Sequence, residues 1–146
     1  MNQYFEETIL NADPIDLIRL LYHRAISSVT EAREHLRERR IAQRSAAILQ
    51  AYSVLTELIA SLRPDAAPDM AKQLRCLYLY VQKLLVEANM RQADEPLAEA
   101  LSLLATLQEA WSAVAENLSR EEASGGHAWR AMTKPPAGRE RIAVHA

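Results

Sequence analysis

The amino-acid sequence predicts an all-α fold: an antiparallel up-and-down four-helix bundle with an N-terminal arm and a flexible C-terminal tail. Apolar residues recur at alternating steps of three and four along four segments, which keeps one stripe of each helix facing a partner. The chain has only 3 glycines and 5 % aromatic residues, a composition that disfavours a β-sandwich or barrel. Its 146 residues suit one domain that buries a core without disulfides or metals.

Two helices are predicted on either side of the charged run at residues 37–40. Asp13 is suited to cap the first helix and Pro14 to open it, because the N–H that proline lacks has no partner there. The predicted core stripe of this helix is Ile18, Tyr22, Ala25, Val29, Ala32 and Leu36. The predicted stripe of the second helix is Ile41, Ser45, Ile48, Tyr52, Leu55, Ile59 and Leu62. Two prolines within residues 63–69 end the second helix.

Two further helices follow, separated by a short polar connection. The predicted stripe of the third is Met70, Leu74, Leu77, Val81, Leu84 and Ala88. Asp94 is suited to cap the fourth, whose stripe is Leu97, Leu101, Leu104, Leu107, Trp111, Val114 and Leu118. Short connections make successive helices antiparallel. The predicted organisation is an arm at residues 1–12, a bundle at 13–122 and a tail at 123–146, where Gly-Gly and Pro-Pro pairs interrupt any period.

These helices contain more apolar residues than one core stripe uses. A bundle helix needs roughly three apolar positions in seven, and residues 74–90 exceed this. The surplus either fills the flanks of the core or lines grooves that receive the apolar faces of a partner's helices. The residues predicted to line such grooves are Leu17, Leu49, Val54, Leu58, Leu79, Leu85 and Val86, whereas Tyr52, Leu77, Val81 and Trp111 are predicted to belong to the core. Four apolar residues of the arm are predicted to form a lid that covers this surface and can lift off: Tyr4, Phe5, Ile9 and Leu10.

The sequence predicts no cofactor, metal or catalytic site. Its four histidines form neither an H-x-x-x-H pair nor a Glu-x-x-His motif, and no glycine-rich phosphate loop is present. The single cysteine, Cys76, lies in an apolar run, which predicts an inert, buried thiol. The protein is therefore predicted not to be an enzyme.

The charge distribution predicts no nucleic-acid partner. Residues 1–122 carry 13 Lys and Arg against 18 Asp and Glu, whereas residues 123–146 carry 4 against 1. Glu34 and Glu38 interrupt the arginines of residues 33–44, as expected for a solvated helix end. No run of 18 apolar residues occurs, and the first residues lack the basic and apolar regions of a signal peptide. These features predict a cytoplasmic protein that does not insert into membranes.

Four segments resemble the flagellar secretion chaperone family, FliS. They are ADPIDLIRLLYHRAI (12–26), LTELIASL (55–62), LYLYVQKLLVEAN (77–89) and LQEAW (107–111), and their order and spacing match that family over about residues 4–118. Leu79 stands where the family commonly has an acidic residue, which makes the surface beside the third helix more apolar.

The resemblance implies an export chaperone that binds the disordered C-terminal segment of flagellin, prevents premature polymerisation and aids its delivery to the flagellar type III export apparatus. The export gate and a co-chaperone are further candidate partners. Such a chaperone is expected to be a monomer or a weak homodimer. The alternative is a self-associating adaptor or structural bundle with no flagellin client, whose surplus apolar faces are buried in a homodimer. Trp129 in the tail either folds back on the bundle or forms a short docking motif.

Overall fold

A computed structural model describes residues 14–65 and 67–123, and these ranges contain four α-helices and no β-strand. The helices are α2 (Pro14–Arg37), α3 (Ile41–Ala60), α4 (Pro68–Arg91) and α5 (Asp94–Ala123). They confirm the predicted all-α four-helix bundle. The predicted arm, the lid residues Tyr4, Phe5, Ile9 and Leu10, the cap Asp13 and residues 124–146 of the predicted tail lie outside the described residues.

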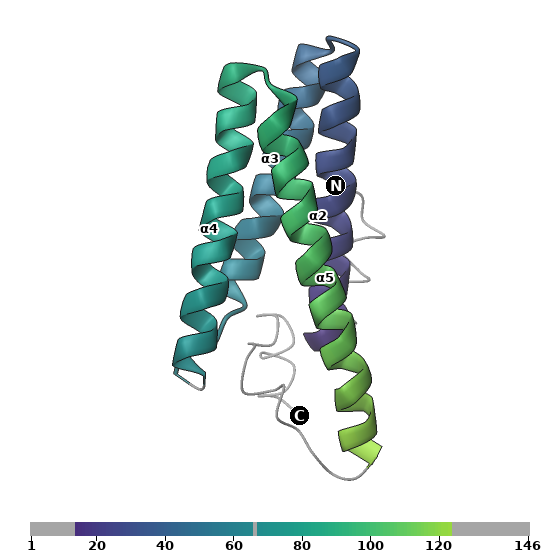
Figure 1. The fold of residues 1–146 in the computed structure, drawn as a ribbon, viewed down its shortest axis with the longest axis vertical. Coiled ribbons are helices and arrows are strands. Elements are labelled where there is room, and N and C mark those ends of the chain that lie inside the picture. Colours follow the sequence, from purple (N-terminus) through teal and green to yellow (C-terminus); the bar gives the residue numbers. More distant parts are fainter. Residues whose placement is uncertain (1–13, 66, 124–146) are drawn as a thin grey trace, which may run out of the picture.

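The four helices form a closed ring in which each packs against two others. Helices α2 and α4 each contact both α3 and α5, and consecutive helices reverse direction along the long axis (Figure 1). Side-chain contacts follow the same order. Arg33, late in α2, meets Asp94 at the start of α5, and Arg44, early in α3, meets Asn89 late in α4. Ends that meet in this way belong to antiparallel neighbours.

The two shortest connections reverse the chain without glycine, since all three glycines come after residue 123. Arg39 after α2 and Gln92 after α4 adopt left-handed backbone conformations, with φ of 59° and 52°. The amide after each of them donates to the carbonyl five residues earlier, at 2.9 and 3.2 Å. This is the Schellman pattern, which satisfies helix-end carbonyls and offsets the cost of about 1 kcal/mol for a non-glycine residue there.

Two tyrosines form the polar centre of an otherwise apolar core. Tyr22 of α2 and Tyr78 of α4 are the largest fully buried side chains; their hydroxyls lie 2.7 Å apart and their rings are tilted by 58°. Burial raises the pKa of both hydroxyls, while a hydrogen bond with Trp111 acts in the opposite direction. Because each hydroxyl has the other as partner, α2 and α4 are joined across the core without an unsatisfied phenol.

The structure confirms the predicted stripe of α2 but corrects those of α3 and α4. The buried residues of α4 are Ala71, Leu74, Tyr78, Val81, Gln82, Leu84, Leu85 and Ala88, and those of α3 include Ala47, Ile48, Ala51, Val54, Leu55 and Leu58. Leu74, Val81, Leu84 and Ala88 of α4 are therefore buried as predicted. Three residues predicted for the core, Ile41, Tyr52 and Met70, are 58 %, 37 % and 46 % exposed. Leu77, also predicted for the core, is only partly buried, whereas Val81 and Trp111 are buried as predicted. Both helices have apolar residues on neighbouring faces, so their periodicity allowed two rotations about the helix axis.

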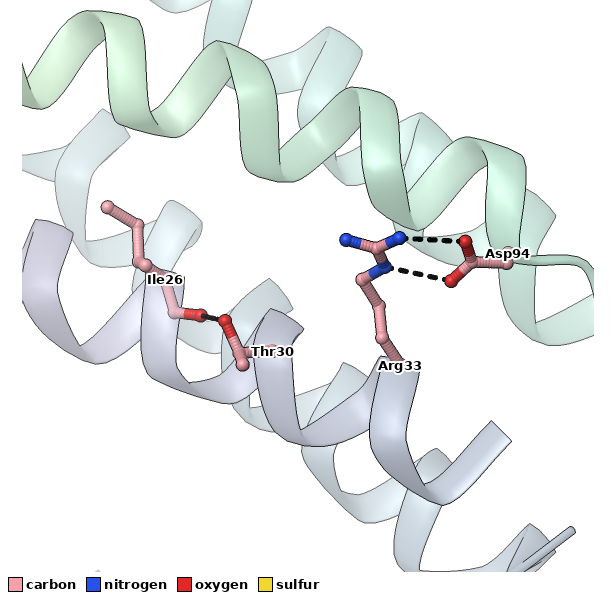
Figure 2. Close-up of polar contacts among 4 residues, drawn as sticks. All are labelled: Ile26, Thr30, Arg33 and Asp94. Carbon is pink, nitrogen blue, oxygen red and sulfur yellow. Dashed lines mark hydrogen bonds and ion pairs between the residues drawn. The ribbon is translucent and has the colours of Figure 1, made fainter. Parts of the chain in front are cut away.

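An ion pair joins the end of α2 to the start of α5. Figure 2 shows the Arg33 guanidinium facing Asp94, with Nε and Nη2 each donating to a different carboxylate oxygen at 2.9 Å. One turn earlier, the Thr30 hydroxyl donates to the Ile26 carbonyl at 2.8 Å. The hydrogen bonds from Arg33 hold the pKa of Asp94 below its ordinary value. Asp94, predicted as a cap, is thus the first residue of α5 and also ties this helix to α2.

We expect Asp94→Asn to lower the free energy of unfolding at pH 7 by roughly 0.5–1 kcal/mol, the range for a partly exposed bidentate pair. Because the folded pKa of Asp94 is depressed, its stabilisation is complete above the unfolded value of about 3.9 and is lost as pH falls through the folded pKa. Urea unfolding of the variant and the parent at pH 7 and pH 3 measures this. Asp69→Asn is the control, since Asp69 lies in the first turn of α4 and makes no ion pair among the described residues. An equal loss for Asp94→Asn at both pH values would contradict the prediction.

Candidate protein-binding groove

One hollow between α3 and α4 gathers large apolar side chains at the surface. Tyr52 of α3 and Leu79, Val86 and Met90 of α4 line a volume of about 560 Å³, and all four are more than a third exposed. Leu49, 66 % exposed, lies one turn before Tyr52 on the same face of α3. We call this surface, formed by Leu49 and the lining of the hollow, the α3/α4 groove.

The wall that α4 contributes is a continuous stripe. The residues of this stripe follow one another at steps of three and four, so they lie along one side of the helix. They are Cys76, Leu79, Lys83, Val86 and Met90. Cys76 is exposed, and the prediction that it is buried is wrong. Its position two residues from both Leu74 and Tyr78, which face the core, turns it outward.

Partly buried polar contacts hold the two walls of the groove at a defined separation. Gln82 of α4, only 6 % exposed, donates through Nε2 to the Tyr52 carbonyl at 3.1 Å and to Thr56 Oγ1 at 2.9 Å. Nearer the other end of the hollow, Arg44 Nε and Ser45 Oγ both donate to Asn89 Oδ1 at 3.2 Å. Since buried polar groups are costly to leave unpaired, these contacts resist sliding of α3 along α4. The groove therefore has a preformed floor.

The charges around the groove leave one cation uncompensated. Arg91 Nη1 donates to Glu87 Oε1 at 2.6 Å, one turn away on α4, so these two charges neutralise each other. Lys83 is exposed and makes no ion pair among the described residues. The groove is thus apolar, with a single ammonium group between Leu79 and Val86.

The structure divides the seven residues predicted to line grooves. Leu49, Leu79 and Val86 are exposed and lie together on the α3/α4 groove. The other four residues face the core, so the prediction that they lie at the surface is wrong. They are Leu17 and Val54, each 7 % exposed, and Leu58 and Leu85, each 0 % exposed. Val54, Leu58 and Leu85 belong to the apolar faces of α3 and α4 that were not chosen as the core stripe in the prediction.

Sequence reasoning missed two groove residues, Tyr52 and Met90. A signal was present, because Tyr52 follows Leu49 by three residues and Met90 follows Val86 by four. The arginines of residues 33–44 were also predicted to be solvated, whereas Arg44 is 5 % exposed and its Nε donates a hydrogen bond to Asn89.

Within the described residues, no cluster of three or more His, Cys, Asp or Glu side chains is placed to hold a metal ion. None of the four described helices combines the length and hydropathy needed to span a bilayer.

Comparisons with known proteins identify the family to which this chain is similar. Residues 1–118 match the family described as flagellar protein FliS. The chain is 28 % identical over 118 residues to the flagellar secretion chaperone FliS of Salmonella typhimurium, a match that covers 80 % of this chain and 87 % of that protein. It is 27 % identical over 118 residues to the flagellar secretion chaperone FliSB of Pseudomonas aeruginosa, covering 78 % and 94 %.

Proposed function

Because this chain belongs to the FliS family of flagellar secretion chaperones, we propose that it binds the disordered C-terminal segment of flagellin as helix laid in the α3/α4 groove. Membership in a chaperone family also confirms the prediction that the protein is not an enzyme. By covering that segment, the chaperone prevents premature polymerisation of flagellin. It acts in the cytoplasm and delivers its client to the flagellar type III export apparatus.

The observation that supports the proposal is the exposed apolar lining of the α3/α4 groove. Leu79 and Val86 are each 45 % exposed and Met90 is 78 % exposed. Removing such half-exposed side chains from water is worth about 1 kcal/mol each, so a docked helix gains several kcal/mol from the lining as a whole. Because Gln82 and Asn89 already join the walls, the chaperone loses little freedom when the client binds.

The client supplies most of the ordering cost. A disordered segment that folds on its partner gives up conformational entropy, which keeps the affinity below what the buried area alone would predict. Moderate affinity suits a chaperone that must release its client at the export apparatus.

We expect the purified protein to bind an isolated C-terminal flagellin segment of about 50 residues one-to-one, with an increase in helix content because the segment folds on the groove. Calorimetric titration measures the stoichiometry and affinity, and circular dichroism of the mixture measures the helix gained. The segment should come from the same organism. Absence of both heat and helix gain would overturn the proposal.

Light scattering separates the chaperone from a self-associating bundle. The chaperone should be a monomer, or a dimer that dissociates on dilution. A dimer that persists on dilution and releases no subunit on adding the segment would instead indicate that the exposed faces of α3 and α4 bury each other.

We also propose that the N-terminal arm, residues 1–12, competes with the client through the lid residues Tyr4, Phe5, Ile9 and Leu10. A lid lowers the apparent affinity by the fraction of time it is docked. Deleting residues 1–12 should therefore tighten binding of the flagellin segment in the same titration. Unchanged or weaker binding would rule out the competing lid.

A further inference from the structure

We infer that Lys83 selects clients whose groove-facing helix surface contains a carboxylate between its apolar residues. The inference rests on the proposed function and specifies the client's chemistry: an amphipathic helix with one Asp or Glu flanked by apolar residues at steps of three or four. The contact is an ammonium–carboxylate pair made across the α3/α4 groove.

The position of Lys83 within the lining supports this inference. Lys83 comes four residues after Leu79 and three before Val86, so it lies on the same stripe of α4 as both. It is one of the residues that line the 560 Å³ hollow, as Tyr52 of α3 also does. A helix that covers the two apolar residues must also cover the lysine.

Among the residues that line the hollow, the one carboxylate near this ammonium group is already paired with another cation. Glu87 is the one carboxylate in the lining of the hollow, and it is bonded to Arg91 at 2.6 Å. Lys83 itself makes no ion pair with a described residue. Lys83 is exposed, so its ammonium group is accessible to water when no helix covers the groove.

Binding of a client helix changes the solvation of the Lys83 ammonium group. A covering helix removes water from the lysine, and a desolvated charge without a partner opposes binding. A client carboxylate at this level restores the lost interaction, a purely apolar face does not, and a client lysine adds repulsion. The apolar lining thus supplies attraction for many amphipathic helices, while Lys83 discriminates among them.

Charge reversal tests the inference on the full-length protein. The probe is the C-terminal flagellin segment used in the titration, prepared as the parent sequence and as variants in which each Asp or Glu is changed singly to Lys. The chaperone variants are Lys83→Glu and Lys83→Met, the second of which removes the charge without adding another. Arg19→Glu is the matched control, because Arg19 is an exposed cation on α2, outside the groove and without an ion pair among the described residues. Circular dichroism establishes that each variant keeps the helical content of the parent.

We expect Lys83→Glu to weaken binding of the parent segment about tenfold, the effect of reversing one close charge pair, and Arg19→Glu to change it less than about twofold. Lys83→Met should weaken binding by a smaller factor and reduce its dependence on salt. One Asp→Lys or Glu→Lys change in the segment should restore binding to Lys83→Glu while weakening binding to the parent chaperone.

Three results would overturn the inference in distinguishable ways. If the parent chaperone binds the segment and both Lys83 variants match it within about twofold, Lys83 has no selective role and the proposed function stands. If no charge change in the segment restores binding to Lys83→Glu, the lysine does not face a client carboxylate. If the parent chaperone does not bind the segment at all, the proposed function fails and the inference fails with it.

Discussion

Leu85→Ala is expected to destabilise the bundle by about 2–5 kcal/mol, because it removes a fully buried side chain and leaves a cavity that the core cannot close. Leu85 lies on the buried stripe of α4 beside Val81 and Ala88. Were it a groove residue, as periodicity suggested, the loss would be a few tenths of a kcal/mol. Urea unfolding followed by circular dichroism measures the change in the midpoint of the transition at constant slope.

The neighbouring residue provides the control for this measurement. Val86 is 45 % exposed and lies on the groove side of α4, so Val86→Ala should cost less than about 0.5 kcal/mol. Equal effects of the two substitutions would show that α4 is rotated differently about its axis. A normal midpoint for Leu85→Ala would have the same meaning.

Leu79→Asp combined with Val86→Asp is expected to weaken binding of the flagellin segment at least about 100-fold while the bundle stays folded. The two substitutions remove apolar contacts worth about 1 kcal/mol each and place two carboxylates where the client helix would desolvate them. Both parent side chains are half-exposed, so the core is not disturbed. Calorimetric titration measures the affinity, and a thermal melt establishes the fold.

Met70→Asp is the matched control for the double variant. Met70 is 46 % exposed on α4 and does not line the hollow, so its substitution should leave client affinity within about twofold. The new carboxylates at 79 and 86 lie one turn from Lys83 on either side and can pair with it, so this variant reports on the groove as a whole. The Lys83 substitutions report on the charge alone. Full affinity in the double variant would place the client elsewhere on the bundle.

The bounds of the helices could be predicted because local chemistry decides them. Pro14 and Pro68 open α2 and α4, and the prolines of residues 63–69 separate α3 from α4. The stripe of α2 was also predictable, since Tyr22 and its partners stand out from a helix with charged residues on its other faces. Leu17 is the exception on α2, since it was predicted to line a groove and is only 7 % exposed.

The groove was only partly predictable, because the apolar surplus on α3 and α4 fits two rotations. Leu49, Leu79 and Val86 were identified, but Leu58 and Leu85 were placed on the surface and Tyr52 in the core. Hydrophobicity does not distinguish these positions. The buried and exposed positions differ in whether their face of the helix packs against the other helices of the bundle.

Short-range patterns and composition are enough to predict the all-α class, the order and extent of the four helices and the resemblance to flagellar secretion chaperones. The apolar stripe of α3 and α4 that is buried depends instead on how the four helices pack. The hydroxyl contact between Tyr22 and Tyr78 and the bonds from Gln82 to α3 exist in one rotation alone, and they join residues 56, 30 and 26 positions apart. Such contacts form only when the helices pack, and they leave Tyr52, Leu79, Val86 and Met90 at the surface beside Lys83.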